Sequence, residues 1–521
     1  MALFQYLTFS ILLMVIGAPI AWLLGRKKGR VGGVFALAVM GISFFVFALA
    51  WFEMAYISPY QTYEEVLLWI DPLYLLEPST PSFGFLFGFY LDGLNLPVAT
   101  IIYILTTAAT CYSIGYMAKS PGQGKFFALL LLYNAGILGV VLATNLVQFY
   151  IFWELMLIPS YFLIAQWGTK PRSVNIALKY FIFTHIGAVC ILLGIAGIWS
   201  LSGAATLNIV QFYTVPSAPI INLVAAMASP VVLNLVKLLV VLFLVGFSVK
   251  MAIFPLHTWL PDAHAEAPTP ISVILSGVMI ETAAYAIVRI LVTFMFDAFA
   301  SLSFYLMIFA VVTMFYGGIM ALAQKDTKRL FAYSSISQMG YIFFGLTSVT
   351  LAGAGLYGVT GATFHIFTHA LGKGLLFMTA GALMMQVGHE RGRDITAMGG
   401  LAKRMPWTAM IALIAALSIA GTPPLAGFAS EWIIFAGGAM AGSIFMVMFA
   451  VISTALTASY VLWFIKRVFF GSTPTAMARV QETTWWVRAP MLGLAALIVI
   501  IGLWPGFVIN RLFEAVYALL P

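Results

Sequence analysis

Long apolar stretches follow one another along almost the entire chain, separated by short polar connections. Each stretch is continuous and lacks the residue-by-residue alternation of a barrel strand, and about 20 apolar residues are what a helix needs to cross a bilayer. We therefore expect an all-α integral membrane protein with about fourteen transmembrane helices. Their approximate ranges are 4–24, 31–51, 93–117, 126–146, 148–166, 178–200, 233–262, 270–292, 302–323, 331–349, 356–386, 407–438, 441–465 and 487–509.

Basic residues fall in every second connection between these ranges. They are Arg26, Lys27, Lys28, Arg30, Lys119, Lys125, Lys170, Arg172, Lys179, Lys325, Lys328, Arg329, Arg391, Arg393, Lys403, Arg404, Lys466, Arg467, Arg479 and Arg488. The connection from 52 to 92 has no Lys or Arg, and its charges are Glu53, Glu64, Glu65, Asp71, Glu77 and Asp92. Because short cytoplasmic loops collect Lys and Arg, the alternation predicts a multi-pass protein with both termini outside.

Composition excludes several function classes. Hydrophobic residues make up 63% of the chain and charged residues 8%, and the mean hydropathy is +1.04. The net charge of +8 is spread over short loops without an aromatic platform, which argues against nucleic-acid binding. Cys111 and Cys190 lie in expected helices without metal-ligand spacing. No connection is long enough for a soluble catalytic domain, so we expect no catalytic residue, metal or cofactor in this chain.

Five ionisable side chains lie inside the expected spans: Glu154, Lys250, Glu281, Lys373 and Glu431. A charge at mid-membrane costs about 3 kcal/mol or more, and it usually marks an ion or proton pathway. The structural alternative for Glu154 is a carboxylate satisfied by nearby hydroxyls such as those of Ser160 or Tyr161.

Two of the apolar ranges are interrupted by proline. Pro255 follows Lys250 by five residues, and Pro423 and Pro424 precede Glu431. Proline removes a backbone donor, and broken backbone inside a membrane is tolerated only when it is buried in protein or lines a wet cavity. A packing kink would account for either break alone. A matching pair of breaks, each near a charge, instead indicates an internal repeat with an ion site.

His365, His369 and Lys373 are spaced four residues apart and so share one helix face. Zinc binding by the two histidines is an alternative, but Lys373 would repel the metal, and a proton relay is favoured. We expect His185, on an apolar helix face, to be structural. His257 and His264 border the first break, and we expect both to lie at the membrane interface without a role in the relay.

Five ordered motifs carry a resemblance to a known family. They are WELMLIPSYFLIAQWG (153–168), KMAIFPLHTWLPDAHAEAPTPIS (250–272), QKDTKRLFAYSSISQMGY (324–341), FHIFTHALGKGLLF (364–377) and GTPPLAGFASEW (421–432). The chain resembles the antiporter-like subunits of respiratory complex I, Mrp cation/proton antiporters and membrane-bound hydrogenases, nearest to the M-type, Mrp D-like branch. The resemblance implies two inverted five-helix repeats. The expected divisions are 1–120, 121–295 (helices 4–8), 296–470 (helices 9–13) and 471–521.

The resemblance also implies roles for the buried charges. Glu154 matches the fifth-helix glutamate and Lys250 the seventh-helix lysine, which form an ion pair whose separation releases a proton. His365, His369 and Lys373 match the central hydrophilic axis, and Glu431 matches the terminal exit group.

Glu281 departs from the family pattern, which usually has lysine at this place in the eighth helix. The sign of the central charge is reversed, and a carboxylate, unlike an ammonium, is able to ligate sodium. A neutral carboxyl is the alternative, because burial disfavours the charged form.

Three functions follow. The first is a proton- or sodium-translocating subunit of a redox-driven complex in an energy-coupling membrane, with the redox centres in partner subunits. The second is a subunit of a stand-alone Mrp-type antiporter, and the third is a purely structural membrane subunit. In the first two, the expected partners are lipid and other membrane subunits, including homologous antiporter-like subunits, with H⁺ or Na⁺ as the ion.

Overall fold

The computed structural model describes residues 5–57, 62–70, 85–168, 172–201, 209, 229–350 and 355–520. Its longer helices up to the first break are α1 (Tyr6–Lys27), α2 (Gly29–Ile57), α3 (Asn95–Tyr116), α4 (Gln123–Leu142), α5 (Leu146–Trp167), α6 (Ser173–Leu201) and α9 (Pro230–Met251). After the break come α10 (Leu260–Glu266), α11 (Thr269–Ile274), η1 (Leu275–Met279), α12 (Glu281–Ala286), η2 (Ile287–Val292) and α13 (Phe296–Ala300).

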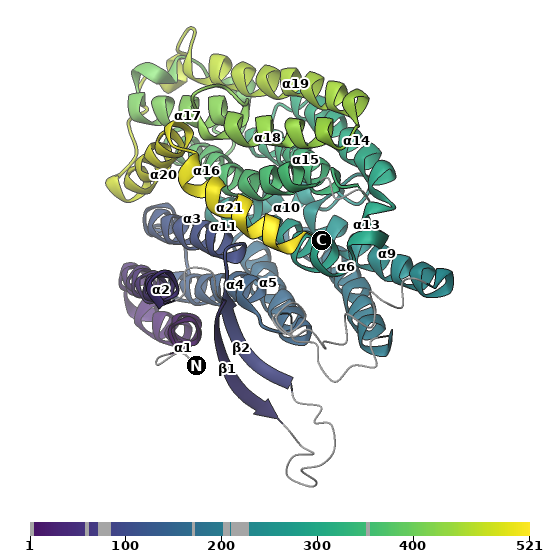
Figure 1. The fold of residues 1–521 in the computed structure, drawn as a ribbon. Helices are drawn as coiled ribbons and strands as arrows, with labels where there is room; N and C mark the ends of the chain where they lie inside the picture. Colours follow the sequence, from purple (N-terminus) through teal and green to yellow (C-terminus); the bar gives the residue numbers. More distant parts are fainter. Residues whose placement is uncertain are drawn as a thin grey trace.

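The remaining helices form the other half of the bundle (Figure 1). They are α14 (Ser303–Leu322), α15 (Thr327–Thr347), α16 (Leu356–Val387), η3 (Ile395–Ala397), η4 (Leu401–Lys403), α17 (Pro406–Ile419), α18 (Ala426–Met440), α19 (Ile444–Phe469), η5 (Thr475–Met477), α20 (Trp485–Leu503) and α21 (Gly506–Leu519). The C-terminal helix α21, yellow in Figure 1, packs against α16.

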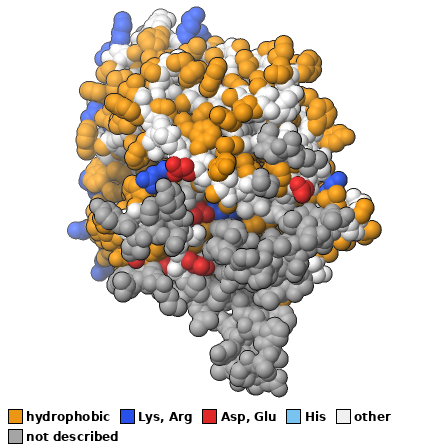
Figure 2. Space-filling view, in the orientation of Figure 1, with side chains coloured by type: hydrophobic (Ala, Val, Ile, Leu, Met, Phe, Trp, Pro, Cys, Tyr) orange, Lys and Arg blue, Asp and Glu red, His pale blue; other side chains and the backbone are white. Residues whose placement is uncertain are grey.

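The expected all-α membrane architecture is confirmed. Among the described residues, 12 helical segments are long and apolar enough to cross a membrane. The expected range 331–349 corresponds to α15, whose polar residues keep it out of those twelve, and 407–438 is divided into α17 and α18. The count of about fourteen therefore stays a prediction. Hydrophobic side chains cover much of the described surface in Figure 2, with Lys and Arg gathered along its left margin.

A two-stranded antiparallel hairpin, which was not expected, occupies part of the acidic connection. It comprises β1 (Tyr63–Ile70) and β2 (Phe85–Leu91), with Tyr63 opposite Leu91. Glu65 accepts hydrogen bonds from the backbone N–H groups of Leu7 and Thr8 at 2.7 and 2.8 Å, so it satisfies the free donors at the start of α1. Asp71, Glu77 and Lys170 lie outside the described residues.

The segment from α11 to η2 is the centre of the molecule. Every residue from Thr269 to Val292 is buried, and the segment packs against α3, α9 and α16. Two π-helical turns, η1 and η2, flank the short α12 that begins with Glu281. Such wide turns inside helices often accompany functional sites.

Candidate ion-relay site

The first proline break positions Lys250 at the end of α9. Ala252 adopts a left-handed backbone (φ 58°) and ends the helix. Carbonyls near the helix end then need other donors. The Trp259 indole N–H donates to the Val249 carbonyl at 2.8 Å, and Thr313 accepts from the Phe254 N–H at 3.1 Å. The irregular backbone is thus buried and hydrogen-bonded, as expected for a break within a membrane.

Lys250 is 1% exposed, and its ammonium lies over the Trp153 ring, 5.2 Å from the centroid. Its Nζ atom has no hydrogen-bond partner among the described residues. Attraction to the indole face is the contact that offsets part of the cost of burying this charge.

Glu154 contacts His185 rather than Lys250. Its Oε2 atom lies 3.3 Å from His185 Nδ1, and the two side chains are 20% and 46% exposed. Phe181 stacks on the imidazole at a centroid distance of 5.6 Å. We call Glu154 and His185 the outer pair. No ion pair joins Glu154 to Lys250 within the described part of the chain, so the proton switch implied for these two residues stays a prediction.

Of the two hydroxyls considered for a merely structural Glu154, those of Ser160 and Tyr161, the Ser160 hydroxyl is engaged elsewhere. Ser160 shares a hydrogen bond with Tyr180 at 2.7 Å and donates to the Leu157 carbonyl at 2.8 Å. His185, expected to be structural, instead contacts the glutamate of the candidate site.

Glu281 meets His369 in the interior. The Glu281 carboxyl oxygen Oε1 is hydrogen-bonded to His369 Nδ1, and both side chains are almost completely buried. Glu281 Oε2 and His369 Nε2 are buried without a partner among the described residues. A carboxyl group and an imidazole in direct contact are able to share or exchange a proton.

His365 continues this contact one helical turn away. Its ring stacks on that of His369 at a centroid distance of 6.1 Å. Its Nε2 atom lies 2.8 Å from Gln338 Oε1 and its Nδ1 atom lies 2.9 Å from the Ser430 hydroxyl. The buried chain, as we call it, therefore links α12, α16, α15 and α18 through Glu281, His369, His365, Gln338 and Ser430.

Glu431 follows Ser430 and is placed by the second break. Gly421 lies in the connection between α17 and α18 and has φ +64°, a backbone conformation that favours glycine. A Cβ built on Gly421 would lie 2.2 Å from Glu431 Oε2. The turn that contains Pro423 and Pro424 thus places the backbone of Gly421 against the Glu431 carboxyl group. Glu431 is 4% exposed.

Lys373 lies on the same helix as the two histidines but contacts a different group. Its ammonium donates to the Ser334 hydroxyl, which in turn donates to Tyr460 at 2.8 Å. His365, His369 and Lys373 all lie on α16 and are all buried. Lys373 contacts Ser334 and is not part of the buried chain.

Several site residues had not been singled out from the sequence. Gln338 and Ser430 lacked a distinguishing signal, because uncharged polar residues are common in helices of transporters. Arg289 had a signal, since it is an arginine inside an expected span, and it pairs with Asp92 at 2.7 Å. His257 and His264, expected at the membrane interface, are both buried within the protein.

We compared the sequence and the structure with those of known proteins. Residues 143–457 match the family model described as "NADH:quinone oxidoreductase/Mrp antiporter, TM". The chain belongs to this family. Residues 79–127 also match the model "NADH-Ubiquinone oxidoreductase (complex I), chain 5 N-terminus". Both matches agree with the resemblance carried by the five motifs.

Relatives within the antiporter-like family include NADH-quinone oxidoreductase subunit M of Pseudomonas aeruginosa. It is 32% identical over 521 residues, which cover 97% of this chain and 95% of the relative. F(420)H(2) dehydrogenase subunit M of Methanosarcina mazei is 32% identical over 446 residues, or 83% of this chain and 84% of the relative. The two relatives share the designation M, which agrees with the expected M-type branch.

Solved structures show the same fold. A chain of the membrane-bound sulfane sulfur reductase, an archaeal respiratory membrane complex, gives a TM-score of 0.81 at 28% identity, covering 96% of this chain and 77% of that chain. The Mrp complex from Dietzia gives 0.80 at 22% identity, covering 99% and 98%. Respiratory complex I from Thermus thermophilus gives 0.80 at 24% identity, covering 98% of both. The latter two matches concern the fold alone.

Proposed function

We propose that this chain is the proton- or sodium-translocating, antiporter-like membrane subunit of a redox-driven complex related to complex I. The observation that carries the proposal is the direct contact between Glu281 and His369 in a segment with no exposed residue. An isolated ionisable pair at this depth is costly to keep and is usually retained for conduction.

The buried chain supplies a route for a proton. A neutral imidazole with a hydrogen-bond partner at each nitrogen can accept a proton on one side and release one from the other. His365 has this arrangement between Gln338 and Ser430. Glu281 therefore acts as the central proton-accepting group, His369 and His365 as carriers, and Glu431 as the exit group.

Lys250 and Glu154 act at the other end of the route. The Lys250 ammonium lacks a hydrogen-bond partner among the described residues, so movement of Glu154 away from His185 would give it a counter-charge. Entry of a proton would then depend on the position of one carboxylate.

The host complex is assigned through the relatives, whose names belong to quinone and F(420)H(2) oxidoreductases. We propose redox-bearing subunits and homologous antiporter-like subunits as partners. Purification of the complex from its native membrane tests this. Co-purifying iron–sulfur subunits support the redox-driven complex, whereas recovery of only small membrane subunits would support the Mrp-type alternative.

Ion translocation is tested with the purified complex reconstituted into vesicles. Electron transfer should acidify or alkalinise the vesicle lumen in sodium-free buffer if protons are carried. A requirement for added sodium would assign Na⁺ instead, and electron transfer without any ion movement would contradict the proposal.

Membrane orientation is part of the same proposal. Both termini are expected outside, because the basic connections alternate along the chain. Single cysteines at Lys28 and Glu64 should be labelled from opposite sides of intact cells, with Glu64→Cys accessible from outside. Labelling of Glu64→Cys from the cytoplasm alone would show that the orientation is opposite to the one proposed.

A further inference from the structure

An apolar groove lies between α2, α3 and α20, away from the ion-relay site. Its volume is about 520 Å³, and its walls include Leu37, Phe44, Ile104, Cys111, Leu494 and Leu497. These side chains come from three helices whose outer faces are apolar. The groove is therefore open to whatever occupies the hydrocarbon layer at this flank.

One glycine keeps the groove hollow, and a second leaves open space near it on α2. A Cβ built on Gly41 or Gly493 would meet no atom within 4 Å. Gly493 lines the groove, and Gly41 lies on α2 between Leu37 and Phe44. Gly25, by contrast, is packed, since its Cβ would lie 2.4 Å from Gly124 Cα. Gly41 and Gly493 are thus not needed for helix contact, and they leave space beside the bundle.

A cation lies at one end of the groove. Arg30, Leu37 and Phe44 are seven residues apart, so they follow one face of α2. Arg30 is about 10 Å from Leu37 along the axis, at about 1.5 Å per residue. Its guanidinium stacks over Trp486 at 5.4 Å, and the Cys111 thiol approaches the Trp486 carbonyl at 3.9 Å. Arg30 and Trp486 therefore lie beyond one end of the groove, and tryptophan and basic residues gather at membrane interfaces.

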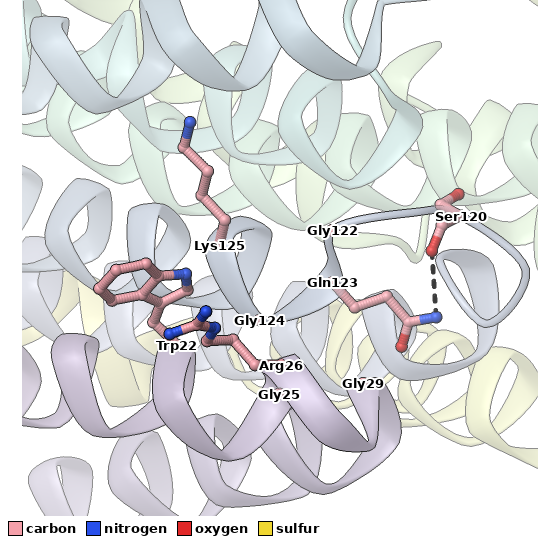
Figure 3. A pocket seen from close by; sticks show the side chains of 9 residues that line it. All are labelled: Trp22, Gly25, Arg26, Gly29, Ser120, Gly122, Gln123, Gly124 and Lys125. Atoms are coloured by element: carbon pink, nitrogen blue, oxygen red, sulfur yellow. Dashed lines mark hydrogen bonds between the residues drawn. The ribbon is translucent and has the colours of Figure 1, made fainter.

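This end of the bundle carries further basic residues. Arg26 and Lys125 line a neighbouring pocket of about 380 Å³ between α1 and α4, where they lie on the same side as Trp22 (Figure 3). Among the described residues, no ion pair involves Arg26, Arg30 or Lys125. The charge that would complement this end is an anion.

We propose that the groove binds one acyl chain of an anionic phospholipid whose phosphate lies at Arg30. Fourteen residues separate Arg30 from Phe44, or about 21 Å of helix. That length matches one leaflet, since half of the hydrocarbon core is about 15 Å and the headgroup region adds to it. Thr107 also lines the groove, and its hydroxyl is buried without a partner among the described residues.

Native mass spectrometry of the full-length chain in detergent tests the site with two probes, phosphatidylglycerol and phosphatidylcholine of identical chains. Phosphatidylglycerol should be retained in preference. Arg30→Gln should reduce this preference about fivefold, because one basic residue near a membrane surface contributes about 1 kcal/mol toward an anionic lipid. Arg467→Gln, which removes one exposed charge at the end of α19, should leave retention unchanged.

Gly493→Leu should fill the groove and abolish retention of the tightly bound lipid without disturbing the helices, since its Cβ faces open space. Ala496→Leu adds similar bulk to an exposed position on α20 and should have no effect. Equal retention of the two lipids, or full retention in Gly493→Leu, would overturn the proposal.

The occupant in the assembled complex is identified by a photoreactive amino acid at position 493. A phospholipid adduct supports the site. An adduct to another polypeptide would show that a partner helix, and not a lipid, fills the groove. Neither result depends on ion translocation, so the lipid site is tested independently of the proposed function.

Discussion

The outer pair and the buried chain contain the same two residue types, glutamate and histidine, in different surroundings. Glu154 and His185 are 20% and 46% exposed and lie 3.3 Å apart. Glu281 and His369 are almost completely buried and in closer contact. A partly exposed pair has open space in which to move, whereas a buried pair loses much when either partner is removed. The outer pair is therefore suited to changing partners, and the buried chain to passing protons between fixed groups.

The first prediction tests whether the buried chain needs a titrating carboxyl group. Glu281→Gln keeps the shape and hydrogen bonding with His369 but cannot take up a proton. Ion translocation by the reconstituted complex should fall about 100-fold, within the range by which positioned acid–base groups act. Glu281→Lys, the commoner family residue, should not restore it, because His369 is positioned for a carboxyl.

Thr282→Val is the matched control for Glu281→Gln. Among the described residues, the Thr282 hydroxyl donates to the nearby Met279 carbonyl at 2.7 Å and contacts no other polar group. Translocation should stay near the wild-type rate in this variant. Wild-type translocation by Glu281→Gln would mean that the ion route passes around the buried chain.

The second prediction concerns Lys250, which belongs to neither pair in this structure. Lys250→Met keeps packing against Trp153 and removes the charge, so translocation should fall about tenfold or more if a proton-bearing group is lost. Its thermal stability in detergent should stay equal or rise, by about 1 kcal/mol, because a buried charge without an ion partner is replaced by an apolar group.

Glu154→Gln is the companion to Lys250→Met. It should also uncouple translocation while the complex still assembles. If both variants pump at the wild-type rate, the switch assigned to these two residues is wrong.

The third prediction compares carriers within the buried chain. His365→Gln preserves hydrogen bonding toward Gln338 and Ser430 but removes a proton carrier, so translocation should fall about tenfold, less than for Glu281→Gln. Electron transfer rates measured in detergent should change less than pumping in vesicles. A loss of electron transfer equal to the loss of pumping would indicate a general disturbance of the fold.

The smallest effect is expected for His185, the histidine of the outer pair. His185→Phe keeps the stacking with Phe181 and removes only the 3.3 Å contact to Glu154. Pumping should change about twofold, measured against Lys179→Gln as a control on the same helix. A loss as large as that of Glu281→Gln would place His185 on the main route and remove the distinction between the two pairs.

Much of the fold follows from the hydrophobic pattern alone. Most of the predicted ranges agree with the helices to within about six residues, because continuous apolar runs have few alternatives in a membrane. The range 233–262 instead extends past the end of α9 at Met251, and α21 was not predicted as a separate helix. The hairpin was not predicted, since its strands of eight and seven residues are too short to span a bilayer and β1 includes Glu64 and Glu65. The proline breaks were located correctly, because proline marks its own position in the sequence.

The site was less predictable than the fold. Glu281, His369 and Glu431 were singled out by their charge or spacing, but their contacts join helices far apart in the chain. The outer pair was missed because His185 lies among apolar residues, and only the packing of α5 against α6 brings it to Glu154. Residue spacing predicts which side chains share a face of one helix, but it does not predict contacts between helices.

The complete burial of residues 269–292 also constrains how the chain is made. Glu281 and Arg289 lie in this segment, which alone would be a poor candidate for release into lipid. The partner of Glu281 is His369, 88 residues later, and the covering helix α16 is synthesised after all of α14 and α15. The ribosome therefore delivers the central segment well before its neighbour α16 exists. During that interval the segment has to be sheltered by α3, α4 and α9 or by the insertion machinery, and biogenesis of the first half is completed only when the second half arrives.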